Sequence, residues 1–90
     1  EISNTLKSFS SILEENEFMK KNIEKFSSLS QSEKDNLKYI IKGFTNERIG
    51  EILHISPNTS RTHRNRIWKK LNIHRFNDCI KYKCFFNQTP

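Results

Sequence analysis

The N-terminal third of the chain carries apolar side chains at steps of three and four residues, which is the period of an amphipathic helix. The stripe consists of Ile2, Leu6, Phe9, Leu13, Asn16, Met19, Ile23 and Phe26. No Gly or Pro interrupts residues 2–26, so the pattern predicts one long helix that ends or bends at 27–28. Two interpretations of its apolar face remain open. It packs on helices of the same chain, or it is a dimerising or signalling helix in which Asn16 fixes the register.

A second helix is predicted by the signal that follows this segment. Ser30 and, three residues later, Glu33 form a capping box that satisfies two backbone amides left free at a helix start. The helix is expected to run to about Lys42. Gly43 then ends it, because glycine readily adopts the left-handed conformation found after helix ends.

Two more helices follow, separated by a three-residue turn. Thr45 caps a short helix over about 46–53, and residues 54–56 form the turn. Pro57, whose missing amide costs nothing at a first helical position, opens a helix that runs to about Leu71. Two helices joined in this way predict helix-turn-helix geometry, in which the second helix lies in the DNA major groove.

A last helix is predicted from about Phe76 to Phe86, with a frayed tail over 87–90. The pattern leaves open whether its aromatic side chains are core or an apolar patch for a partner; these are Tyr82, Phe85 and Phe86. The fold class is therefore all-α. The chain divides into an amphipathic linker or dimerisation helix (1–28) and a helix-turn-helix domain (29–90).

Charge is unevenly distributed along the 90 residues, whose net charge is +6. Residues 1–28 carry four Lys and five Glu, whereas residues 29–90 carry twelve basic and five acidic side chains. Within 56–75 there are six basic residues and no acidic one. A solvated helix face normally mixes signs, so this segment indicates an anionic partner such as nucleic-acid phosphate or an acidic membrane surface.

The helix that begins at Pro57 has two distinct faces. Ile67 and Leu71 must be core, with Ser60 and His63 on the same stripe. The opposite stripe carries guanidinium, amide and hydroxyl groups, which read base edges in the major groove. We expect base reading by Asn58, Arg61, Thr62 and Asn65. We expect phosphate contacts by Asn46, Thr59, Arg64, Arg66, Lys69 and Lys70.

From Leu29 to Ile80 the sequence resembles the LuxR-type (GerE-type) helix-turn-helix domain of bacterial transcription regulators. The recognition helix carries the pattern Ile-Ser-x-x-Thr-x-Arg-x-His-x-x-x-Ile-x-x-Lys-Leu. The matching residues are Leu29-Ser30, Glu33, Leu37, Gly43, Asn46, Ile49, Leu53, Ile55-Ser56, Thr59, Arg61, His63, Ile67, Lys70-Leu71 and Ile73. Apolar, capping and basic positions agree in spacing over about fifty residues.

The resemblance implies a four-helix domain that dimerises through its last helix and binds an inverted-repeat operator. It also implies a regulated upstream domain, outside this fragment. The expected dimer interface is Cys79, Lys83 and Phe86. Several positions depart from the pattern that is usual in the family, among them Ser60 and Gly50. Ser60 replaces an aliphatic residue, which predicts a looser seat for the recognition helix, and Gly50 replaces an alanine, which weakens its own helix by about 1 kcal/mol.

Other function classes find little support in the sequence. There is no paired carboxylate, nucleophile with a base, or Gly-rich phosphate loop, so an enzyme is not expected. Cys79 and Cys84 lack metal-ligand spacing, and we expect no metal and no cofactor, with both thiols reduced in a cytoplasmic protein. No long apolar run or signal peptide is present, so no membrane span is expected. The alternatives are a helical interaction module that has lost DNA binding and a sigma-factor-like helix-turn-helix.

Overall fold

The computed structural model describes the backbone of residues 2–86 and the side-chain surroundings from residue 13 onward. Within this part the chain is all-helical, as predicted. The elements are α1 (Ile2–Ser27), α2 (Gln31–Ile41), α3 (Asn46–Leu53), α4 (Pro57–Leu71), α5 (Phe76–Ile80) and the 3₁₀ helix η1 (Lys81–Phe86). None of the described helices is long and apolar enough to cross a membrane. The predicted fraying of 87–90 and the burial of the stripe before residue 13 lie outside the described residues.

The predicted helix starts are confirmed, because each depends on contacts three residues apart. The Ser30 hydroxyl accepts from the Glu33 amide at 3.1 Å, and the Glu33 carboxylate accepts from the Ser30 amide at 2.8 Å. Thr45 accepts from the Arg48 amide at 3.1 Å to cap α3. Ser56 caps α4, with Pro57 in the first turn.

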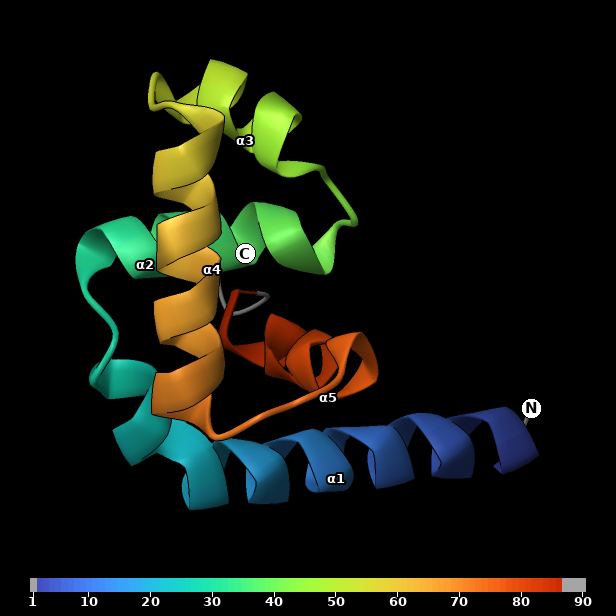
Figure 1. The fold of residues 1–90 in the computed structure, drawn as a ribbon. Coiled ribbons are helices and arrows are strands. Elements are labelled where there is room, and N and C mark those ends of the chain that lie inside the picture. The colour runs from blue at the N-terminus through green and yellow to red at the C-terminus, as the bar shows by residue number, and fades with distance from the viewer. Residues whose placement is uncertain (1, 87–90) are drawn as a thin grey trace.

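The core lies where α4 crosses α2 (Figure 1). α3 packs on the N-terminal part of α4, and α1 runs past its C-terminal end. The buried apolar residues are Leu29, Leu37, Ile40, Ile49, Ile67, Leu71, Ile73, Cys79 and Tyr82. They come from every part of the chain after α1, so burial of one shared core holds α4 in place.

The apolar stripe of α1 does not face its own domain as a whole. Phe18 and Phe26 pack against the core, whereas Leu13 and Ile23 are 50% and 46% exposed. Asn16 is exposed as well. The predicted stripe did not include Phe18, because this residue lies beside the positions that recur along the whole helix. Tertiary contacts select the face that Phe18 and Phe26 share.

The last predicted helix is α-helical only to Ile80 and continues as 3₁₀ turns. Three residues per turn place Tyr82 and Phe85 on one side of η1, with ring centroids 5.7 Å apart. Phe26 stacks on Phe85 at 4.3 Å and meets Phe86 edge-on at 5.5 Å. Tyr82 is therefore core, and the two phenylalanines are half-buried against it.

Candidate nucleic-acid interface

The turn between α3 and α4 depends on a close backbone approach. His54 adopts the left-handed conformation (φ 58°), and the Ile55 amide donates to the Gly50 carbonyl at 2.9 Å. A Cβ on Gly50 would lie 2.5 Å from the Ile55 carbonyl oxygen, closer than real Cβ contacts occur. Gly50 thus weakens α3 locally but permits the tight turn that sets the angle of α4.

The inner face of α4 is fixed by apolar and polar contacts together. Ile67 and Leu71 are buried as predicted, and Ser60 is fully buried. The Ser60 hydroxyl donates to Asn36 Oδ1 at 3.0 Å, with Asn46 Oδ1 at 3.4 Å. The expectation of a looser seat at Ser60 is therefore wrong, because the shorter side chain gains a hydrogen bond to a buried amide.

Two of the predicted base readers project from α4 without partners. Arg61 and Asn65 are exposed and make no hydrogen bond or ion pair with any described residue. They stand four residues apart, hence one turn apart on one face. An ion pair of Arg61 with Glu51 or Asp78 is the alternative to base reading, but these carboxylates pair elsewhere, Glu51 with Arg48 at 2.9 Å and Asp78 with Lys81 at 3.9 Å.

The other two predicted readers are also exposed but shorter in reach. Asn58 lies in the first turn of α4, and its backbone carbonyl accepts from the Thr62 hydroxyl at 3.0 Å. The Thr62 hydroxyl is therefore occupied as a donor and retains acceptor capacity.

The predicted phosphate contacts divide into free and engaged groups. Arg66 and Lys69 are exposed and free of partners among the described residues. The Arg64 guanidinium lies over the Trp68 ring at 5.0 Å, which holds it against the helix while its polar edges stay available. The Thr59 hydroxyl pairs with the Ser56 hydroxyl at 2.8 Å.

Lys70 has a role in the fold that sequence reasoning missed. Its ammonium lies 2.7 Å from the Glu33 carboxylate and donates to the Ser28 carbonyl at 3.3 Å. The Glu33 side chain is only 3% exposed. Burial raises the pKa of Glu33, but hydrogen bonds from Lys70 and from the Ser30 backbone outweigh it and hold that pKa below its usual value. Glu33 is thus both the cap of α2 and the anchor of the last turn of α4.

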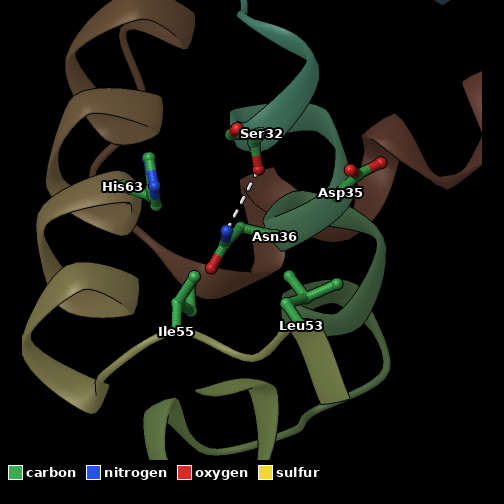
Figure 2. A pocket seen from close by; sticks show the side chains of 6 residues that line it. All are labelled: Ser32, Asp35, Asn36, Leu53, Ile55 and His63. Carbon is green, nitrogen blue, oxygen red and sulfur yellow. Dashed lines mark hydrogen bonds between the residues drawn. The ribbon is translucent and has the colours of Figure 1, made fainter. Parts of the chain in front are cut away.

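A cavity of about 120 Å³ opens between α2 and α4, beside the turn (Figure 2). Its lining residues are Ser32, Asp35, Asn36, Leu53, Ile55 and His63. His63, on the inner stripe of α4, is half-buried, and its Nδ1 is buried without a hydrogen-bond partner among the described residues. Asn36 donates to the Ser32 carbonyl at 3.0 Å on the opposite wall. Among the described residues, no cluster of His, Cys, Asp or Glu could hold a metal ion.

The three residues expected at a dimer interface differ in accessibility. Cys79 has no exposed surface, and burial raises the pKa of its thiol to about 12. Lys83 is exposed, and Phe86 is half-covered by Phe26. Both Cys79 and Cys84 are free, buried thiols. A surface for a second copy at this end of the chain would therefore consist of Lys83 and Phe86 rather than Cys79.

The arrangement is that of a helix-turn-helix module, in which α3 and the turn hold a basic α4 with its polar face outward. Residues 27–82 match the family of bacterial regulatory proteins of the LuxR type, the GerE domain. The chain therefore belongs to that family, which consists of DNA-binding regulator domains and not of enzymes. No solved structure matches the chain significantly.

Proposed function

We propose that this chain binds double-stranded DNA sequence-specifically as the output domain of a transcription regulator, with α4 in the major groove. The observation that carries the proposal is the row of unpaired polar and cationic side chains along the outer face of α4. Arg61, Asn65 and Lys69 are exposed there, while Ile67 and Leu71 fix the opposite face. A rigid helix with free donors on its outer face is the arrangement that direct readout requires.

Base discrimination is assigned to Arg61 and Asn65, supported at the helix start by Asn58 and Thr62. Arginine pairs through two hydrogen bonds with guanine, and asparagine does so with adenine. Arg61→Ala and Asn65→Ala should each cost about 1–3 kcal/mol on the cognate site and little on random DNA. Because neither side chain has a partner among the residues that the structure describes, the melting temperature should stay unchanged. An unchanged ratio of cognate to random affinity would refute the assignment.

Phosphate binding is assigned chiefly to Arg66 and Lys69, with Arg64, Thr59 and Asn46 around them. The charge of 56–75 supports this assignment, because six basic residues without an acid repel one another unless phosphates neutralise them. Roughly four to six phosphate contacts per subunit give a slope of log affinity against log salt of about −4 to −5. Fluorescence titration with a random duplex at several salt concentrations measures that slope. A flat response would instead favour a helical protein-interaction module.

A homodimer on an inverted-repeat operator belongs to the same proposal, with 1–28 as a linker or dimerisation helix and with Lys83 and Phe86 in the interface. Support comes from membership of the family and from the half-exposed Phe86 ring. Sedimentation of the protein, free and on a duplex with two half-sites, tests it. A monomer under both conditions would contradict the dimer.

A further inference from the structure

α1 presents two different faces, of which its own domain covers only one. Phe18 and Phe26 contact η1, and Asn22 accepts a hydrogen bond from the Tyr82 hydroxyl at 3.3 Å. Successive residues turn by about 100°, so these positions share one face of the helix. Leu13 and Ile23 point away from it and are the large apolar side chains most exposed among the described residues.

The exposed Leu13 and Ile23 belong to a seven-residue repeat in the sequence of α1. Alternating steps of four and three join Ile2, Leu6, Phe9, Leu13, Asn16, Lys20 and Ile23. This spacing is the seam of a left-handed coiled coil and differs from the 3.6-residue period of a helix that packs on a globular core. The helix has 26 residues, about 39 Å in length, and its N-terminal part extends past the other helices (Figure 1).

We propose that this seam pairs with the same seam of a second copy, as a parallel, in-register coiled coil that carries two recognition helices. The inference deepens the dimer of the proposed function and moves its main contact from η1 to α1. The two interpretations of the helix are then compatible, since one face packs on the domain and the other on the second copy.

The polar members of the seam specify the occupant. In a parallel in-register pair, Asn16 meets its own copy, and each amide donates to the other. In an antiparallel pair or against an unrelated apolar groove, the same amide faces apolar atoms and loses its hydrogen bonds. Lys20 occupies a seam position, where its apolar stem would lie along the paired helix, and Glu17 and Glu24 lie three residues before and four residues after it on the same helix. All three of these charged side chains are exposed.

Electrostatics disfavour η1 as the main contact. Lys38, Lys42 and Lys83 line a hollow of about 320 Å³ together with Ile41 and Phe86. Two copies meeting at Lys83 and Phe86 would bring these lysines together; the acids that lie near Lys83, Glu14 and Glu15, line a separate hollow against α1. Like charges placed opposite one another oppose association, whereas Lys20, the one cation of the α1 seam, is flanked along the helix by Glu17 and Glu24.

Sedimentation equilibrium of the 90-residue chain tests the seam. We expect a reversible dimer, and Leu13→Ser with Ile23→Ser should raise its Kd by about tenfold or more. The matched control is Glu14→Ser with Lys21→Ser, which changes two exposed residues outside the seam and preserves the net charge. Both variants should melt at the wild-type temperature, since none of the four side chains is buried. A wild-type monomer, or equal effects of the two pairs, overturns the proposal.

The orientation is tested by mild oxidation of Ile23→Cys. Ile23 lies at one end of the seam, so it faces its own copy in a parallel in-register pair and the opposite end of the seam in an antiparallel pair, and a covalent dimer should form only in the parallel pair. Lys21→Cys is the control, because its position lies off the seam, and the native thiols Cys79 and Cys84 are buried. Cross-linking of Ile23→Cys no faster than the control overturns the parallel arrangement.

DNA measurements separate this inference from the proposed function. The double serine variant should bind a single half-site within about twofold of the wild type and lose cooperativity on two half-sites. If the wild type bound DNA specifically yet remained a monomer with no cooperativity, the seam would be overturned and the DNA function would stand. If it bound no DNA, sedimentation and cross-linking would still decide the dimer.

Discussion

Replacing Lys70 by Met separates a role in the fold from a role in phosphate binding. Methionine keeps most of the apolar stem of lysine and removes only its charge and hydrogen bonds. The Glu33 carboxylate, 3% exposed, would then retain the hydrogen bond from the Ser30 amide and lose its cation. A buried carboxylate without its partner costs free energy, because protein atoms replace the water that would solvate it.

The magnitude follows from the exposure of the two partners. Breaking a fully buried ion pair costs about 3–5 kcal/mol. Here the Lys70 side chain is 39% exposed, so water reaches the site and screens the pair. We expect a loss of about 1–3 kcal/mol in the free energy of unfolding, the usual cost of one unsatisfied buried group. For a domain of this size that loss lowers Tm by roughly 5–20 °C.

Lys69→Met is the matched control, one residue away and without a partner among the described residues. Thermal unfolding by circular dichroism should show Tm lowered for Lys70→Met and unchanged for Lys69→Met. Salt titration of DNA binding should give the opposite pattern, with the slope reduced by about one unit for Lys69→Met only. In a Glu33→Gln background, Lys70→Met should cost much less. If Lys70→Met lowered the salt slope by one unit and left Tm unchanged, Lys70 would be a phosphate ligand and the reasoning would fail.

Three further outcomes follow from contacts of the same core. Ser60→Val leaves Asn36 Oδ1 without its closest donor and should lower stability by about 1–3 kcal/mol in urea unfolding, even though the family favours an aliphatic residue there. A variant as stable as the wild type would show that the hydroxyl contributes nothing. Gly50→Ala should also destabilise, because overpacking against the Ile55 carbonyl costs about 1–3 kcal/mol and exceeds the helix-propensity gain of about 1 kcal/mol; a raised Tm would contradict the close approach. Because the pKa of Glu33 is lowered in the folded state, its contribution is present above the unfolded pKa and is lost as pH falls through the lower folded value. Stability measured from pH 7 to acid should decline in that window, less steeply in Lys70→Met, and parallel curves would argue against the pair.

The sequence by itself determined the features that depend on neighbours along the chain. The helix starts at Ser30, Thr45 and Ser56 could be predicted because a capping hydroxyl meets an amide three residues away. The two faces of α4 could be predicted because a helix turns by a constant angle per residue, which puts Ile67 and Leu71 on one side and Arg61 and Asn65 on the other.

Contacts between distant residues were decided only by the tertiary structure. Lys70 and Glu33 are 37 residues apart, and Ser60 and Asn36 are 24 apart, so no local pattern pairs them. In each case the sequence showed a polar residue near a core stripe, but it did not show which distant residue would form the hydrogen bond.

The same limit explains α1 and the last helix. Helical periodicity shows that an apolar stripe exists, but not which neighbour covers it. In α1, Phe18 packs against the core, whereas Leu13 is exposed. Tertiary contacts also explain the change from α5 to 3₁₀ turns, because these turns bring Tyr82 and Phe85 together against α1. Helix propensity acts within a few residues and is worth tenths of a kcal/mol per residue, whereas burial of an aromatic side chain is worth several times more. Tertiary packing therefore decides wherever the two compete.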